Sequence, residues 1–287
     1  MAGFVKGKLD TAHDPTWCPG CGDFAIWMAL KNVILDLQIE PHNVLIVYGI
    51  GCSGNMTNYV STYGWHSLHG RAVPTAVGAK LMNKNLTVIV VAGDGDSLGE
   101  GMGHFIHAMR GNADITYIIH DNKVYGLTIG QAAPTAIKGY KSKSTPEGII
   151  EINANALSLA VATGCGFVSK GFSGRIPHLQ NLIKQAILHK GFSLVDVYQP
   201  CVTFNKVNNF PFYNERIYDL QQEGHDVHDR SKAFEKALEW GDRIPIGIFY
   251  QDDRPSYETY LPQEEGEPIV KRPMKVRDLT YLKKEFM

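Results

Sequence analysis

The chain lacks an excess of either charge, a long apolar run and an N-terminal leader pattern. Its 287 residues include 28 Lys and Arg against 29 Asp and Glu, which gives a formal net charge of −1. This balance provides no basic surface for nucleic acid or an anionic membrane, so we expect neither as a partner. The apolar runs have the length of strands and fall short of a bilayer span. Because no charged, apolar and small-residue segment opens the chain, we expect a cytoplasmic protein.

Cysteine is also scarce, with five residues at positions 18, 21, 52, 165 and 201. An odd number that includes a C-x2-C pair argues against a disulfide scaffold and favours an intracellular metalloprotein. Cys18 and Cys21 lie on a Gly/Pro turn, and Cys52 and Cys201 each follow an expected strand. Cys165 falls in a helical run over 154–166, where a free buried thiol is the ordinary case.

Four of these cysteines can converge, because turns and strand ends gather at one edge of a sheet. A four-thiolate site holds Zn2+ or an iron–sulfur cluster. Structural zinc sites usually consist of two compact Cys or His pairs, whereas Cys52 and Cys201 are isolated and far apart in the sequence. The spacing therefore favours a cluster and leaves structural zinc open.

Apolar periodicity predicts strands and helices in alternation, which is typical of an α/β fold with a doubly wound parallel sheet. Expected helices cover 24–37, 72–82, 99–110, 154–163 and 177–189, and expected strands cover 44–48, 88–92, 115–119, 167–170 and 193–198. We expect residues 1–205 to form one cofactor-binding domain. Residues 206–287 contain aromatic, Asn-rich and Pro-rich stretches and one helical pattern over 231–240. They predict an irregular C-terminal arm that packs on partner subunits, and an ordinary irregular surface extension is the open alternative.

The stretch from Val88 to Gln131 carries the most informative pattern. An apolar strand leads into Gly93-Asp94-Gly95-Asp96, and a helix and a second apolar strand then lead into Asp121-Asn122. Open α/β sheets place their ligand crevice at such strand ends. The oxygens of Asp94 and Asn122 suit Mg2+, which takes few protein ligands and fills its shell with water or phosphate. The glycines let a diphosphate approach the backbone, and the next helix offers free N–H groups.

Several motifs together resemble the β subunit of 2-oxoacid:ferredoxin oxidoreductases, with a thiamin diphosphate fingerprint at their centre. They follow in the family's order over residues 13 to about 215 of the sequence: Cys18-Pro-Gly-Cys21-Gly-Asp, Gly-Ile-Gly-Cys52-Ser-Gly, His66-Ser-Leu-His69-Gly-Arg71, Gly-Asp94-Gly-Asp, Asp121-Asn122-x-x-Tyr-Gly-Leu-Thr-x-Gly-Gln131 and Gln199-Pro-Cys201. The resemblance implies a thiamin diphosphate-binding fold, Mg2+ and one [4Fe-4S] cluster. It also implies an α subunit in a doubled αβ unit, a 2-oxoacid, CoA and ferredoxin. The implied reaction is oxidative decarboxylation to acyl-CoA and CO2, which can also run in reverse.

Site residues follow from the same resemblance. The implied cluster ligands are Cys18, Cys21, Cys52 and Cys201, and the main-chain carbonyl of Val124 joins Asp94 and Asn122 as an implied Mg2+ ligand. The expected cofactor-binding residues are Gly51, Ser53, His69, Gly93, Gly95, Asp96, Gly126, Leu127 and Thr128, and expected catalytic positions are His69, Thr128 and Asn55. His66 is the lesser of the two histidine candidates, and Arg71 suits either a phosphate or an anchor for its own loop.

Two positions depart from the family pattern. Ile129 stands where a Lys is often present, and Asn55 stands where a basic residue is frequent. Both changes put recognition of a distant substrate carboxylate by this chain in doubt, so the α subunit is expected to supply that charge. The Glu that activates the aminopyrimidine of thiamin has no counterpart here. We therefore expect this chain to be inactive alone.

Three hypotheses remain open from the sequence. The first is a redox β subunit, with 2-oxoglutarate favoured over pyruvate or branched-chain acids because the two-chain type often serves the citric acid cycle. The second is a non-redox thiamin diphosphate-dependent decarboxylase or ligase subunit with a structural zinc site. The third is a non-catalytic electron-transfer or scaffold subunit, against which the intact Asp94 and Asn122 argue.

Overall fold

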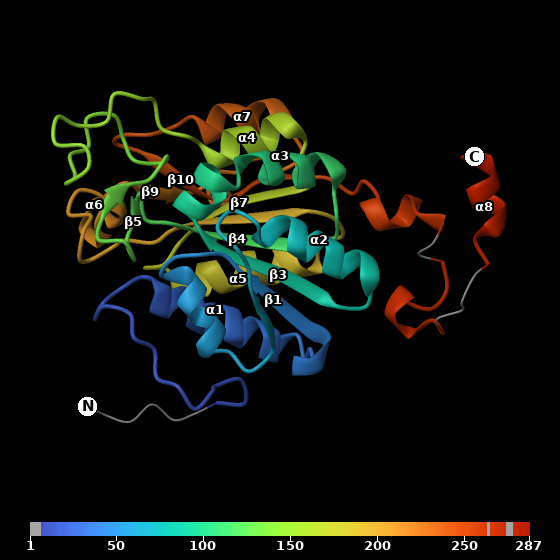
Figure 1. Cartoon of the computed structure of the whole chain (residues 1–287). Coiled ribbons are helices and arrows are strands. Elements are labelled where there is room, and N and C mark those ends of the chain that lie inside the picture. The colour runs from blue at the N-terminus through green and yellow to red at the C-terminus, as the bar shows by residue number, and fades with distance from the viewer. Residues whose placement is uncertain (1–6, 263–264, 274–277) are drawn as a thin grey trace.

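In the part of the chain that the structure describes, an eight-stranded sheet lies between two layers of helices (Figure 1). The computed structural model describes residues 7–262, 265–273 and 278–287. The strand order is β2-β1-β3-β4-β8-β7-β10-β9. Neighbouring strands are parallel except β7 and β10, which are antiparallel. The expected α/β class with a mostly parallel sheet is confirmed.

The strands of this sheet are short and mostly buried on both faces. They are β1 (Val44–Tyr48), β2 (Tyr63–His66), β3 (Thr87–Gly93), β4 (Thr116–Asp121), β7 (Phe167–Phe172), β8 (Ser193–Tyr198), β9 (Ile217–Asp219) and β10 (Ile244–Gln251). Every residue of β1, β4, β7 and β8 is buried, because helices cover both faces of a parallel sheet. A separate small hairpin pairs β5 (Val124–Tyr125) with β6 (Gln131–Ala132).

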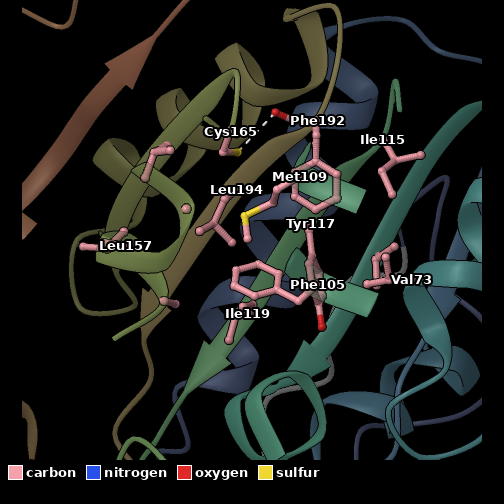
Figure 2. Packing of buried hydrophobic residues seen from close by; sticks show 14 of the residues in the cluster. Val73, Phe105, Met109, Ile115, Tyr117, Ile119, Leu157, Cys165, Phe192 and Leu194 are labelled. Atoms are coloured by element: carbon pink, nitrogen blue, oxygen red, sulfur yellow. Dashed lines mark hydrogen bonds between the residues drawn. The ribbon is translucent and has the colours of Figure 1, made fainter. Parts of the chain in front are cut away.

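The helices divide the hydrophobic core into two main clusters. On one face lie α1 (Asp23–Asp36) and α5 (Ile176–Leu188); on the other lie α2 (Ala72–Met82), α3 (Met102–Gly111), α4 (Ala156–Thr163) and α7 (Arg230–Ala237). Figure 2 shows part of the second cluster, where Phe105 and Met109 of α3 pack against Tyr117 of β4. Two shorter helices are α6 (Phe210–Asn214) and α8 (Thr280–Glu285). No helix in the described ranges is both long and apolar enough to cross a bilayer.

One expected helix differs from the structure, and another ends before Cys165. The helix expected over 99–110 is split into a π-helical turn, η3 (Asp96–Glu100), and α3, so the loop after β3 stays coiled beside the strand ends. The helix expected over 154–163 is present as α4 and ends at Thr163, because Gly164 adopts φ 77° and terminates it. The helical run expected to continue to residue 166 is therefore wrong. Cys165 therefore lies in the turn before β7, not in a helix as expected. It remains fully buried, with Sγ 3.5 Å from the carbonyl oxygen of Phe192 (Figure 2).

The sheet extends beyond the expected domain boundary at residue 205. Within the range expected to be an arm, β10 pairs with β7 and β9 pairs with β10. The prolines around this segment concealed the strand, but Pro245 sits near the start of β10, where a missing N–H is tolerated. After β10 the chain forms short turns and ends in α8, which lies apart from the sheet (Figure 1). Its packing on a partner subunit stays a prediction.

Candidate cofactor site

A cleft of about 90 Å³ lies at the carboxyl ends of β1, β3 and β4, where the loops after these strands meet. Every residue expected to bind the cofactor lines it: Gly51, Ser53, His69, Gly93, Gly95, Asp96, Gly126, Leu127 and Thr128. The expected metal ligands Asp94, Asn122 and Val124 lie in the same lining, and so does Cys52. Parallel strands send their loops to a common edge, which is why these separate motifs meet. The role of each residue stays a prediction.

Asp94 is a buried carboxylate with one oxygen already held. Its Oδ2 accepts hydrogen bonds from the backbone N–H of Lys123 (2.8 Å) and from the hydroxyl of Thr135. Burial raises the pKa of Asp94, and the nearby charge of Asp121 raises it further. A bound cation would compensate for the hydration that this carboxylate loses on burial. Asp94 therefore fits the role of a metal ligand.

Asn122 presents a fixed amide at the next strand end. Its Oδ1 accepts a hydrogen bond from the N–H of Val124 (2.9 Å), and its Nδ2 donates to Oε1 of Gln199 (2.9 Å). Asn205 donates from Nδ2 to the main-chain carbonyl of Asn122 (3.0 Å), which ties the loop after β4 to the loop after β8. A carbonyl oxygen has a second lone pair. Oδ1 can therefore accept the Val124 bond and still bind a cation.

Asp96 organises the cleft by joining three loops. Its Oδ1 accepts from the N–H of Ile50 (3.0 Å) and the N–H of Gly70 (2.9 Å), and Nδ1 of His69 lies 2.8 Å from the same oxygen. Burial raises the pKa of Asp96, and the two backbone hydrogen bonds oppose that shift. Asp96 thus joins the Gly51 and Gly70 loops and lies beside His69.

The two glycines of the Gly-Asp-Gly motif have different structural reasons. A Cβ at Gly93 would meet only Ser53 Oγ, at 3.8 Å, so the backbone there is open to the cleft. A Cβ at Gly95 would lie 2.4 Å from the ring of Tyr125. Gly95 is therefore required by packing against Tyr125, whereas the sequence suggested room for a diphosphate at both glycines.

Three buried polar atoms at the cleft are without a hydrogen-bond partner among the described residues. They are Ser53 Oγ, His120 Nε2 and His69 Nδ1, which is near Asp96 Oδ1 without forming a hydrogen bond. The other ring nitrogen of His120 lies 2.5 Å from Oδ1 of Asp23, a fully buried carboxylate at the start of α1. Unpartnered buried polar atoms are costly, so a polar ligand such as a diphosphate would satisfy them. Sequence reasoning missed His120 and Asp23, because nothing local marks a histidine inside an apolar strand.

The expected cluster cysteines lie in one region beside this cleft. A Cβ at Gly126 would be 3.3 Å from Cys52 Sγ and 3.9 Å from Cys201 Sγ. Cys21 Sγ lies 3.2 Å from Gln199 Nε2 and 3.3 Å from Asp23 Oδ2, and the exposed Cys18 is close enough to raise the pKa of Cys52. Within the described ranges, however, no three His, Cys, Asp or Glu side chains are arranged to hold a metal ion. The four-thiolate cluster therefore stays a prediction.

Of the expected catalytic residues Asn55 and Thr128, Thr128 lines the cleft and Asn55 does not. Asn55 is in η2 (Ser53–Asn58) and does not line the cleft, since this turn carries it beyond Ser53. The catalytic role expected for Asn55 stays a prediction. Thr128 lines the cleft and donates its hydroxyl to Oε1 of Gln131 (2.8 Å).

His66 and Arg71 both contact main-chain carbonyl oxygens. Nε2 of His66 lies 3.1 Å from the carbonyl oxygen of Gly49. Arg71 donates from Nη1 to the carbonyl oxygen of Glu100 (3.1 Å). Arg71 therefore anchors its loop through a main-chain oxygen.

Asp121 faces away from the cleft, although it is adjacent to Asn122 in the sequence. Successive side chains of a strand point to opposite faces. Asp121 accepts from Lys170 (2.8 Å), which also lies 2.5 Å from Oδ2 of Asp196, and all three are buried. These residues line a separate cavity of about 250 Å³ under α4 and α7. The network is distinct from the expected Mg2+ ligands.

Two family models match successive parts of this structure. Residues 49–197 match the C-terminal TPP binding domain of thiamine pyrophosphate enzymes, and residues 201–265 match the C-terminal part of the pyruvate ferredoxin oxidoreductase beta subunit. The first match contains all the loops that form the cleft. The fold and cleft thus define a thiamin diphosphate-binding domain.

Relatives narrow this class to one family. A 2-oxoacid:ferredoxin oxidoreductase subunit beta of Sulfolobus sp is 49% identical over 258 residues, 85% of each chain. The corresponding protein of Saccharolobus solfataricus is 46% identical, covering 83% of this chain and 82% of the relative. A solved 2-oxoglutarate:ferredoxin oxidoreductase of Magnetococcus marinus has 2-oxoglutarate, coenzyme A and succinyl-CoA bound. It superposes with a TM-score of 0.84 at 36% identity, over 87% of this chain and 85% of that chain. The chain belongs to the family of 2-oxoacid:ferredoxin oxidoreductase β subunits, which are oxidoreductase subunits.

Proposed function

We propose that this chain is the β subunit of a CoA-dependent oxidoreductase that decarboxylates 2-oxoglutarate and passes electrons to ferredoxin. One observation carries the proposal: Cys52 lines the same cleft as Asp94 and Asn122. The expected thiolate site therefore begins where the expected diphosphate site ends. This adjacency suits a reaction in which carbon chemistry at one cofactor delivers electrons to another.

Thiamin diphosphate, when bound, supplies the carbanion chemistry that no side chain provides. The chain's contribution is binding and orientation. Asp94, Asn122 and the main-chain carbonyl of Val124 would hold Mg2+, because they offer hard oxygen donors at adjacent strand ends. Asp96 joins the Gly51 and Gly70 loops around the diphosphate.

The cluster is assigned to Cys18, Cys21, Cys52 and Cys201. Burial raises the pKa of Cys52 to about 12, and Asp23 and Cys201 add to the shift. Burial likewise raises the pKa of Cys21, followed by the charge of Asp23. These sulfurs would ionise only with a strongly bound cation, which is what an iron–sulfur centre provides.

An α subunit would complete the active site. Large apolar side chains that are more than half exposed gather on the edge strand β2 and on the loops around the cleft: Tyr63, Trp65, Leu68, Leu127 and Ile129. Such a surface around an open cleft is typical of a subunit interface. It supports an αβ unit, doubled as in the resemblance, with the pyrimidine of thiamin held by the partner. We also propose a cytoplasmic location, where thiols stay reduced.

The test is a reduction assay on the purified αβ complex. Methyl viologen reduction would be followed with CoA and a panel of 2-oxoglutarate, pyruvate and 2-oxoisovalerate, with iron and zinc measured in the same samples. We expect activity to depend on CoA and to be highest with 2-oxoglutarate. Zinc without iron, together with decarboxylation but no viologen reduction, would instead establish the non-redox alternative.

A further inference from the structure

The side chain of Gln199 connects the two expected cofactor sites. It is 1% exposed and directly follows β8, where its N–H donates to the carbonyl oxygen of Asp121 (2.9 Å). Its amide has one atom at each site. Oε1 accepts from Nδ2 of Asn122 (2.9 Å), and Nε2 lies 3.2 Å from Sγ of Cys21. A longer contact joins Nε2 to the carbonyl oxygen of Pro200 (3.4 Å).

The direction of these hydrogen bonds follows from one unambiguous donor. The backbone N–H of Val124 can only donate, so the atom of Asn122 that it meets at 2.9 Å is the oxygen. Nδ2 of Asn122 must then face Gln199, and the Gln199 atom that meets it must be the acceptor Oε1. The remaining amide group, Nε2, is thereby turned toward Cys21 Sγ. The N–H of Val124 in β5 thus determines the donor and the acceptor in each of these hydrogen bonds.

Each end of this arrangement has a physical consequence. At Asn122, the bond to Gln199 keeps the amide from rotating, so that Oδ1 stays at the cleft lined by Asp94. At Cys21, an N–H that points at a sulfur stabilises a thiolate, and it stabilises the more negative, reduced state of a cluster most. Removing that N–H should lower the reduction potential of a cluster ligated by Cys21.

We propose that Gln199 is a positioning residue that both orients the Mg2+ ligand Asn122 and raises the reduction potential of the cluster through Cys21. The proposal rests on the proposed function, since it needs both cofactors. It goes beyond the ligand assignment by linking the two sites through a single neutral side chain. Neither role requires Gln199 to touch substrate.

The experiment compares two substitutions at Gln199 in the purified αβ complex. Gln199→Met keeps the volume and loses both bonds. Gln199→Glu keeps an acceptor for Asn122 but loses the donor to Cys21. Gln221→Met is the matched control, because Gln221 also makes two amide hydrogen bonds, to Ile248 on β10. The readouts are iron content, Mg2+ affinity in thiamin diphosphate binding by calorimetry, and the cluster midpoint potential by EPR-monitored redox titration without substrate.

We expect the Gln199→Met complex to keep its iron, to bind Mg2+ with about tenfold lower affinity, and to have a lower cluster midpoint potential. A tenfold change in the reduced-to-oxidised ratio corresponds to about 59 mV for one electron. In Gln199→Glu the Mg2+ affinity should stay within about twofold of wild type, because the glutamate still accepts from Asn122 and the tenfold cost of losing that support is avoided. The cluster midpoint potential of this variant should fall at least as far as in Gln199→Met. Gln221→Met should change neither quantity.

The inference is overturned if Gln199→Met leaves both quantities unchanged, or if Gln199→Glu weakens Mg2+ as much as Gln199→Met does. Loss of iron in both Gln199 variants would also overturn it, because Gln199 would then be a structural residue. Failure of the proposed function looks different: the wild-type complex itself would lack iron or would not bind thiamin diphosphate. A loaded wild type with unaffected variants refutes only the inference.

Discussion

Lys170 is one of two cations, with Lys123, in a buried charge network, and replacing it should destabilise the fold strongly. Its Nζ lies 2.8 Å from Asp121 Oδ2, 2.5 Å from Asp196 Oδ2 and 3.7 Å from the centre of the Tyr198 ring. Burial alone lowers the pKa of Lys170, but Asp121 and Asp196 outweigh it and the net pKa is raised. The lysine is therefore charged. It is the main opposing charge for Asp196, and it shares the neutralisation of Asp121 with the buried Lys123, whose Nζ lies 3.3 Å from Asp121 Oδ2.

Lys170→Met should cost about 3–5 kcal/mol, because it leaves Asp196 buried without its hydrogen-bonded cation. This is a large share of the roughly 5–15 kcal/mol that stabilises a typical protein. The matched control is Lys184→Met. Lys184 Nζ is also 2.5 Å from a carboxylate, Asp36 Oδ2, but both side chains are substantially exposed. Removing an exposed pair should cost less than about 1 kcal/mol.

The penalty should also depend on pH. Burial raises the pKa of Asp196 to about 6 even with Lys170 opposing the shift. Without Lys170 the pKa should rise further, so Asp196 in the variant can fold protonated. A carboxyl with a raised folded-state pKa contributes stability at low pH that is lost as pH rises through that value. The loss of unfolding free energy in Lys170→Met, relative to wild type, should therefore be smallest near pH 4 and grow toward pH 7.

The assay is guanidinium unfolding followed by circular dichroism, for wild type and both variants at several pH values. A loss of unfolding free energy below about 1 kcal/mol for Lys170→Met at pH 7 would be no larger than that for an exposed ion pair, and it would refute the reasoning. So would a deficit that is independent of pH, since it would show that the carboxylates are not the source of the penalty.

Three further predictions concern the expected sites. Cys201→Ala should remove most of the iron while Cys165→Ala keeps it; unchanged iron in the first, by ferrozine analysis, would defeat the cluster assignment. Asp94→Ala should abolish thiamin-dependent turnover and keep the cluster, with a smaller loss of Mg2+ affinity in Asn122→Ala; normal cofactor binding by the Asp94 variant in calorimetry would contradict the fingerprint. Ile129 adopts φ 71°, so Ile129→Asn should stabilise the chain by about 1 kcal/mol in guanidinium unfolding, whereas a decrease would show that the Ile side chain contributes more than the strain costs.

The sequence determined the class of fold and most of the cleft, because those signals are local. The apolar runs at 44–48 and 193–198 are buried strands with the same bounds, and residues 72–82 form α2 as expected. Glycine and carboxylate motifs at strand ends meet whenever the strands are parallel neighbours, so the sequence could place Asp94 and Asn122 at one cleft. Periodicity failed for β10, whose antiparallel partner β7 lies far back in the chain.

Only the tertiary structure decided which side chains connect these motifs. Asp23 meets His120, and Gln199 joins Asn122 to Cys21, across sequence separations that no local pattern encodes. The alternation of side chains along β4 turned Asp121 toward Lys170 and left Asn122 at the cleft. The reason is physical: a buried polar group must find its partner in three dimensions, whereas periodicity records only which face of an element is buried.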